Sequence, residues 1–331
     1  MNLTKEPPIR MMPEANGIEA MRKRPGLYVG SIDELGVYRL ILGLVESIID
    51  DNRKLKTTIH INLAACGSIM VEYDMTLIDW FELEVIKALS EVCEIHAHQE
   101  VNVYHQGVLV SQRPVETECS LDQIKIIFKP DGTIFTYNML DYYVLFQRVK
   151  ELVYLNPHVT VLLENSENRN RICFELGLEA LLCESRDELD LLGKAQILNL
   201  HFVEKEIDVT VSMGIKFDVD VRLSYVNNIR TYRGGTHVAG LYDGVHDVVN
   251  KHLKDRDQID KSHVIEKLNF VIHVKMANPQ FMGCVKRELG NVEVRDAVKN
   301  GILRHLDAKL VADDDFVKSF EHYVTYEWLY K

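Results

Sequence analysis

The residues with the clearest capacity for chemistry lie on the polar face of one predicted helix. Beyond Gly36, apolar residues recur with the i, i+3, i+4 spacing of a helix that buries one stripe: Val37, Leu40, Ile41, Leu44, Val45, Ile48 and Ile49. The opposite face carries Arg39, Gly43, Glu46, Ser47 and Asp50. A carboxylate such as that of Glu46 can accept a proton from water, so this face is a candidate site for general base catalysis. A solvated acidic helix face would carry the same residues.

A second group of chemically capable residues lies on a predicted strand. Glu94, His96, His98 and Glu100 alternate along the chain and therefore share one face of an extended segment. Carboxylates and imidazoles can bind transition metals, but the pattern does not place the third and fourth ligands of a zinc site. Polar alternation on a half-exposed strand explains the spacing more simply, so we expect no metal site here.

Composition limits the class of protein. The chain has 331 residues, 47% hydrophobic and 27% charged, which suits a soluble protein of two domains. It has no run of ~20 apolar residues and no N-terminal signal core, which predicts a cytoplasmic protein without a membrane span. The net charge of −12 argues against a nucleic-acid surface over the whole molecule but permits a local basic track. Six cysteines without a CxxC pair read as free thiols.

The order of the predicted elements indicates an α+β protein. In the first half we expect a short helix over Ile18–Arg24, strands over 57–63, 68–73, 91–109 and 123–128, helices over 84–90 and 141–155, and a strand within 156–165. In the second half we expect a hairpin over Ile207–Leu223, a helix over Val238–Leu253 with Thr236 as N-cap, a strand over Leu268–Met276, and helices over Val292–Leu310 and Phe316–Tyr330.

Three segments of this chain resemble one known family. They are RKRPGLYVG at Arg22–Gly30, FKPDGTIF at Phe128–Phe135, and a pattern formed by Asn227, Asn228, Ile229, Gly234, Gly235, Thr236 and His237. They resemble the N-terminal ATPase and transducer domains of type IIA topoisomerase B subunits (DNA gyrase B and its topoisomerase IV counterpart), in the GHKL superfamily. The resemblance covers nearly the whole chain but only the first two domains of a gyrase B protein.

The resemblance implies a fold and a domain division. We expect a Bergerat-type ATPase-like α/β sandwich followed by a transducer domain with a ribosomal-protein-S5-like fold. Residues 1–16 would form an N-terminal arm, which in this family reaches across to a second subunit. Residues 17–190 would form the ATPase-like domain, ending in a charged linker at 184–190, and residues 191–331 would form the transducer-like domain.

The resemblance also assigns nucleotide-binding positions, and this chain departs from most of them. Gly43 stands where the family has its catalytic glutamate, and Ser47 stands where an asparagine helps to hold magnesium. Tyr73 takes the place of the adenine-binding aspartate, with Asp74 as the ligand if the alignment slips by one residue. Ile124 replaces a threonine that contacts the nucleotide.

Further departures concern glycines and the lid. Met75 and Leu77 replace glycines beside the adenine position, and Gln123 replaces another before Ile124. The glycine-rich lid that wraps the triphosphate in the family is missing, because the chain runs directly from 79–83 into the following helix. In the transducer loop, Cys284 replaces a glutamine, while Lys286 retains a lysine that reaches the terminal phosphate in the family. We therefore expect no catalytic residue, no bound ATP and no Mg²⁺.

The sequence is compatible with three functions. The first is a catalytically inactive pseudo-ATPase that acts as a dimerisation or binding module, either as a homodimer or paired with a gyrase or topoisomerase IV subunit. The second is an active ATPase subunit that uses Glu46 as a displaced base and Lys286 on the phosphate, with cleavage domains supplied in trans. The third is a DNA-clamping module that uses Arg230, Arg233, Lys286 and Arg287.

Overall fold

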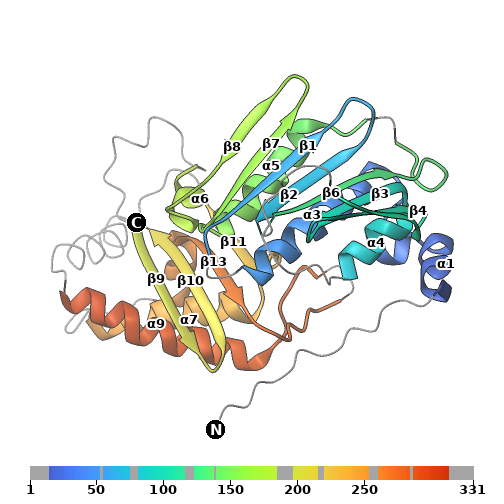
Figure 1. Ribbon diagram of the computed structural model, residues 1–331. Coiled ribbons are helices and arrows are strands. Elements are labelled where there is room, and N and C mark those ends of the chain that lie inside the picture. Colours follow the sequence, from blue (N-terminus) through green and yellow to red (C-terminus); the bar gives the residue numbers. More distant parts are fainter. Residues whose placement is uncertain are drawn as a thin grey trace, which may run out of the picture. The chain divides into compact units, whose positions relative to one another are not determined.

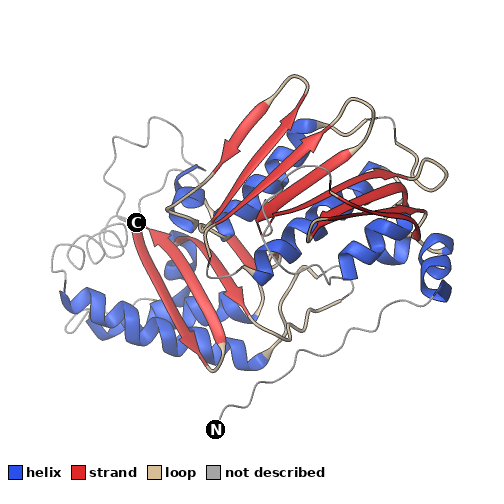
Figure 2. Ribbon diagram, in the orientation of Figure 1, coloured by secondary structure: helices blue, strands red, loops and turns tan. Residues whose placement is uncertain are grey.

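The chain forms two compact units, residues 1–175 and 176–331. A computed structural model describes residues 15–52, 55–74, 81–115, 123–137, 139–184, 197–214, 220–252, 260–283 and 286–312. Each unit has its own mixed sheet and its own helices (Figures 1 and 2), which confirms the predicted α+β class. The predicted boundary at 190, residues 1–14 of the predicted arm, and the helix expected at Phe316–Tyr330 lie outside the described residues.

The first unit contains an eight-stranded sheet with the order β5-β4-β3-β6-β2-β1-β7-β8. Only β1 and β7 pair in parallel; the other neighbours are antiparallel. The strands are β1 (Thr57–Leu63), β2 (Ile69–Asp74), β3 (Ser90–Ala97), β4 (Glu100–His105), β5 (Val108–Pro114), β6 (Gln123–Pro130), β7 (Val159–Asn165) and β8 (Arg169–Ile172).

The helices of the first unit are α1 (Ala15–Lys23), α2 (Gly26–Val29), α3 (Glu34–Asp51), α4 (Phe81–Leu89) and α5 (Tyr142–Leu155). The core lies between the sheet and helices α3, α4 and α5 (Figure 1). Asp33 caps α3, because its Oδ1 accepts a hydrogen bond of 3.0 Å from the backbone N–H of Leu35. Every member of the predicted apolar stripe on α3 is buried, so the prediction for this helix is confirmed.

The second unit contains a five-stranded sheet with the order β12-β11-β13-β10-β9. Its strands are β9 (Ile197–Glu204), β10 (Ile207–Gly214), β11 (Arg222–Val226), β12 (Ile229–Arg230) and β13 (Asn269–Lys275). The predicted hairpin over Ile207–Leu223 is wrong: β10 forms its hairpin with β9, and β13 lies between β10 and β11. Alternating hydrophobicity identifies strands but not their partners, so the late strand β13 could not be placed from the pattern.

The described residues of the second unit include the helices α6 (Leu178–Glu184), α7 (Thr236–His252), α8 (Lys261–Lys267) and α9 (Val292–Ala312). Helix α6 packs on β10 and β13, which accounts for its place in this unit. Helices α7 and α9 approach closely at Gly240, where an added Cβ would lie 2.4 Å from the carbonyl oxygen of Arg295. No helix in the described part of the chain is both long enough and apolar enough to cross a membrane.

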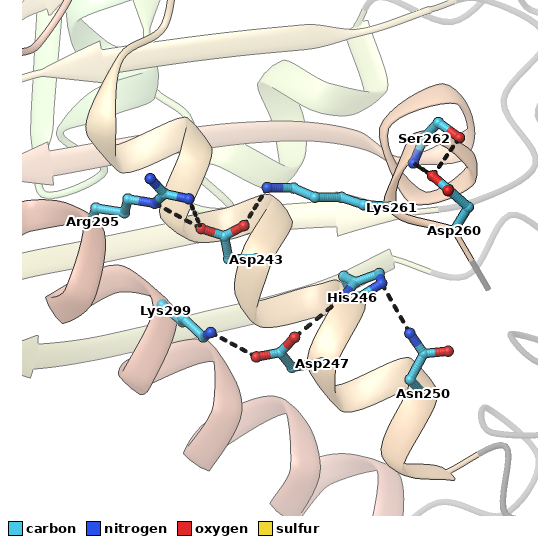
Figure 3. Close-up of polar contacts among 9 residues, drawn as sticks. All are labelled: Asp243, His246, Asp247, Asn250, Asp260, Lys261, Ser262, Arg295 and Lys299. Carbon is cyan, nitrogen blue, oxygen red and sulfur yellow. Dashed lines mark hydrogen bonds and ion pairs between the residues drawn. The ribbon is translucent and has the colours of Figure 1, made fainter. Parts of the chain in front are cut away.

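Ion pairs along one side of α7 reinforce this packing (Figure 3). Asp243 accepts hydrogen bonds of 2.7 Å from Nε and Nη2 of Arg295 and also pairs with Lys261. One turn further, Asp247 lies 2.7 Å from Nζ of Lys299. The cationic partners hold the pKa of both aspartates below the ordinary value, although burial opposes this shift more strongly than any single partner at Asp243. The pairs therefore fix α7 against α8 and α9.

Candidate functional site

Gly43 lies buried in the middle of α3, where the resemblance places a catalytic glutamate. An added Cβ at this position would lie 3.3 Å from Cγ of Glu82, a side chain from α4. The cavity around it measures about 50 Å³ and is lined by Tyr28, Val29, Arg39, Leu40, Gly43, Phe81, Glu82 and Val85. Small-molecule pockets usually measure ~300–1,000 Å³, so this cavity is by itself smaller than a pocket that holds a drug-sized ligand.

Glu82 lies beside Gly43 and Ser47, and the sequence did not single it out. Its Oε2 accepts a hydrogen bond of 3.0 Å from Oγ of Ser47, where the resemblance places an asparagine. Beside it, the rings of Tyr28 and Phe81 lie 6.1 Å apart with an interplanar angle of 35°. The only signal in the sequence was an acidic residue in the first turn of α4, which by itself indicates favourable helix electrostatics rather than a site.

Glu46, the candidate displaced base, is held by Arg39. Nη1 of Arg39 lies 3.0 Å from Oε2 and 3.3 Å from Oε1 of Glu46. Burial raises the pKa of Glu46 above its ordinary value; Arg39 opposes this shift, and the charges of Asp50 and Glu82 add to it. The structure thus places Glu46 on the same polar face as Gly43 and Ser47, as predicted, but with its carboxylate engaged by a cation.

The positions that the resemblance assigns to nucleotide contacts lie on two paired strands. Tyr73 on β2 stands directly opposite Ile124 on β6, and their exposed fractions are 2% and 1%. Burial raises the pKa of the Tyr73 phenol far above its ordinary value. Asp74 is exposed at the end of β2, opposite Gln123, whose Nε2 donates a hydrogen bond of 2.7 Å to Glu72. Two of the predicted positions therefore belong to the packed core. Met75 and Leu77 lie outside the described residues.

The motifs that resemble the family most closely are joined to each other in the first unit. Arg22, from RKRPGLYVG, donates a hydrogen bond of 2.7 Å to the carbonyl oxygen of Ala88 and lies 2.6 Å from Oδ2 of Asp131, from FKPDGTIF. Asp131 also accepts hydrogen bonds from Thr133. Burial disfavours ionisation of Asp131, but Arg22 and Thr133 outweigh it and keep the pKa of the carboxyl below its ordinary value. These motifs therefore hold the scaffold together.

In the second unit, backbone hydrogen bonds join the Gly234–His237 motif to the loop that carries Lys286. The N–H of Arg233 donates to Arg287 (2.9 Å), that of Leu289 to Gly234 (3.1 Å), and that of Thr236 to Leu289 (3.0 Å). Lys286 is exposed and has a left-handed backbone with φ of 52°. Cys284 lies outside the described residues. The retained lysine thus sits on a loop fixed to the start of α7.

Thr236 does not act as the predicted N-cap. It is the first residue of α7, and its buried Oγ1 has no hydrogen-bond partner among the described residues. The reason is that Gly235, with φ of 129°, makes the turn into the helix by itself. The next residue, His237, is fully buried, and its Nε2 lies 3.2 Å from Oγ1 of Thr231.

The four candidate DNA-binding cations lie on neighbouring segments. Arg233 and Arg287 are linked by the backbone hydrogen bond described above, and Lys286 precedes Arg287. Arg230, on β12, places its guanidinium carbon 4.7 Å from the ring centre of the exposed Tyr232. Cations interleaved with an accessible aromatic ring are typical of surfaces that bind single-stranded or duplex nucleic acid.

The four residues considered for a metal site lie on different elements of the structure. Glu94 and His96 share β3, whereas His98 lies in the turn with φ of 50° and Glu100 begins β4, where it accepts a hydrogen bond from Gln112. Within the described ranges no group of three or more His, Cys, Asp or Glu residues could hold a metal ion. Cys66, Cys93, Cys173 and Cys183 are free thiols. Cys119, like Cys284, lies outside the described residues.

Comparisons of sequence find relatives over most of this chain. The family model for DNA gyrase B matches residues 179–324. The DNA gyrase B protein of Clostridium acetobutylicum is 30% identical over 89% of this chain and 54% of its own length. That of Borreliella burgdorferi is 28% identical over 88% of this chain and 54% of its own length. The chain therefore spans about half the length of these curated relatives.

Comparisons of structure extend over both units. The 43K ATPase domain of Thermus thermophilus gyrase B, solved with an aminocoumarin, matches with a TM-score of 0.82 and 20% identity over 94% of each chain. The topoisomerase IV ATP-binding domain of Francisella tularensis, solved with an inhibitor, matches with a TM-score of 0.74 and 22% identity over 93% of this chain and 95% of that one. At this level of identity the likeness shows a shared fold.

Proposed function

We propose that this chain, a homologue of the ATPase and transducer region of DNA gyrase B proteins, is a pseudo-ATPase that acts as a dimerisation and binding module. The observation that carries the proposal is the surroundings of Gly43. Gly43 has no side chain that could activate water, and the cavity beside it, lined in part by Glu82 and Phe81, measures about 50 Å³. The buried Tyr73 and Ile124 support the same conclusion, because they fill the positions that the resemblance assigns to nucleotide contacts.

The retained scaffold supports a role in binding. Arg22 and Asp131 join two of the family motifs, and backbone hydrogen bonds join the other motif to the Lys286 loop. The chain keeps these contacts but has other residues at the positions that the resemblance assigns to nucleotide binding. Such a chain would keep the fold of the family's ATPase region and lose ATP hydrolysis. As partners we propose a second copy of the chain or a gyrase or topoisomerase IV subunit in the cytoplasm, where the module would influence DNA topology through its partner.

A thermal-shift titration tests the proposal. ATP or a non-hydrolysable analogue, each with and without Mg²⁺, should leave the melting temperature of the wild-type protein unchanged. A ligand at one hundred times its dissociation constant would stabilise the native state by ~2.7 kcal/mol, which is a shift of several degrees. The gyrase B protein of Clostridium acetobutylicum, assayed in parallel, serves as a comparison. A Mg²⁺-dependent shift of this chain would contradict the proposal and would favour the alternative of an ATPase with Glu46 as base, to be tested by turnover of Glu46→Gln.

The partner proposal has its own measurement. Purified protein should form a dimer in solution or capture a gyrase or topoisomerase IV subunit. A protein that stays monomeric and captures neither of these would remove the partner idea while leaving the nucleotide result unaffected.

The basic patch favours a second candidate function, which is clamping of DNA. Arg233, Lys286 and Arg287 are exposed on adjoining segments, beside the Arg230 and Tyr232 pair. Binding to duplex DNA should be strong at low salt and should fall at moderate salt, because phosphate contacts release counterions. The double variant Arg233→Glu with Arg287→Glu should lose this binding, whereas Lys205→Glu, an exposed change in the turn between β9 and β10, should not. Absence of binding at low salt would exclude this function.

A further inference from the structure

We propose that Glu82 supplies, from α4, the carboxylate that α3 lacks at Gly43, and that it thereby closes the site from within. This inference rests on the proposed pseudo-ATPase function and deepens it. The Glu82 side chain fills the site in place of a ligand and holds α3 and α4 together.

The Glu82 side chain lies in the space beside Gly43. An added Cβ at Gly43 would lie 3.3 Å from Cγ of Glu82, which is closer than the optimal separation of ~3.5–4.0 Å between carbon atoms. A longer side chain at position 43 would extend into the volume that Glu82 fills. The two positions therefore compete for one place, and the glycine on α3 is what allows Glu82 to enter it.

A hydrogen bond from Ser47 holds the Glu82 side chain. Oγ of Ser47 donates to Oε2 of Glu82 over 3.0 Å. Ser47 lies four residues after Gly43, on the same face of α3, so the side chain of Glu82 covers both positions. A hydroxyl that donates to a carboxylate makes a stronger hydrogen bond than one to a neutral acceptor, which favours this placement of the side chain.

Helix α4, which carries Glu82, packs against α3. Only residues 75–80 separate the end of β2 from the start of α4, so the first turn of α4 follows β2 closely in the chain. Figure 1 shows α3 and α4 together on the helical face of the sheet, and the two helices pack against each other. Phe81 packs near Tyr28, with ring centres 6.1 Å apart, and so closes the region beside Glu82.

Other acidic side chains lie near Gly43 on α3. Glu46 and Asp50 follow Gly43 on α3, and the charge of Glu82 contributes to raising the pKa of Glu46. A further carboxylate at position 43 would meet Glu82 at short range in a partly desolvated site, where like charges repel strongly. Removing Glu82 would relieve this repulsion and would leave Ser47 free to donate to the new carboxylate.

A carboxylate exchange tests the inference by thermal unfolding of the full chain. Gly43→Glu alone should lower the melting temperature through crowding and repulsion. Glu82→Ala alone should lower it by about 2–4 °C through loss of the Ser47 hydrogen bond. The double variant Gly43→Glu with Glu82→Ala should melt higher than Gly43→Glu alone, because the carboxylate then comes from α3. The matched control is Glu84→Ala, since Glu84 also lies in the first turn of α4 but pairs with Lys87.

The inference would be overturned if the changes in melting temperature caused by Gly43→Glu and Glu82→Ala simply add in the double variant, as those caused by Gly43→Glu and Glu84→Ala should. If Gly43→Glu does not fold on its own while the double variant does, the inference is supported in its strongest form. If neither folds, a cycle of Ser47→Ala with Glu82→Ala decides: non-additive shifts support the contact, and additive shifts overturn it. A change in the melting temperature of the wild-type protein on addition of nucleotide would contradict the pseudo-ATPase function. If nucleotide causes no change but the effects of the two substitutions are additive, only the proposed role of Glu82 is contradicted.

Discussion

Gly235→Ala should lower the free energy of unfolding of the second unit by more than ~3 kcal/mol. Gly235 has φ of 129°, a conformation that side chains rarely adopt. An added Cβ would lie 2.3 Å from the carbonyl oxygen and 2.4 Å from the nitrogen of Leu289. These backbone atoms cannot yield, because they form the hydrogen bonds to Gly234 and Thr236.

Urea denaturation, followed by a probe in the second unit, measures this effect. Gly283→Ala is the matched control, because Gly283 also has a positive φ, of 80°, but an added Cβ there would meet no atom within 4 Å. We expect the control to cost only the backbone strain, ~1 kcal/mol. Equal losses for the two variants would show that close packing against Leu289 contributes nothing.

Acid should destabilise the second unit through His237. Burial lowers the pKa of His237 from 6.5 to about 3. Between these values the unfolded chain binds a proton that the folded chain does not, so lowering the pH favours unfolding by ~1.4 kcal/mol per pH unit. At pH 7 the imidazole is neutral in both states and the effect vanishes. The free energy of unfolding therefore begins to decrease as the pH falls below about 6.5, and it decreases further until the pH reaches about 3.

The measurement is the free energy of unfolding at several pH values for the wild-type protein and His237→Gln. The variant should be less stable at pH 7, because the contact with Thr231 changes, but its stability should depend less on pH between about 6 and 4.5. Carboxylates with lowered pKa values, such as Asp243 and Asp247, also destabilise the fold in acid, but mainly at lower pH. Parallel pH profiles of the two proteins would contradict the assignment to His237.

Local patterns in the sequence predicted most elements of the first unit, although α2 and β8 were not predicted. The stripe on α3 repeats over several turns, and Asp141, which caps α5 by accepting from the N–H groups of Tyr143 and Val144, marks the predicted start of that helix. The pairing of the second sheet was not predictable in this way. Strand β13 inserts between β10 and β11 after a long stretch of chain, and no local pattern carries that information.

The candidate site was predictable in part. The resemblance located Gly43, Ser47 and Tyr73, since each lies beside a recognisable motif or on a periodic helix. Glu82 could not be found in this way, because its role depends on a contact between side chains 35 positions apart in the chain. The function of Thr236 was wrongly predicted for a related reason: a threonine before a helix usually caps it, but the conformation of Gly235 decides the local geometry.

The parallel pairing of β1 with β7 bears on how the first unit is made. Residues 57–63 pair with residues 159–165, so one side of β1 has no partner until the chain has been synthesised well beyond the middle of the first unit. Contacts between such distant segments slow folding, because a long loop must close before the contact stabilises anything. During synthesis, the antiparallel pair of β1 and β2 can form early, and it then presents an open strand edge to other nascent chains.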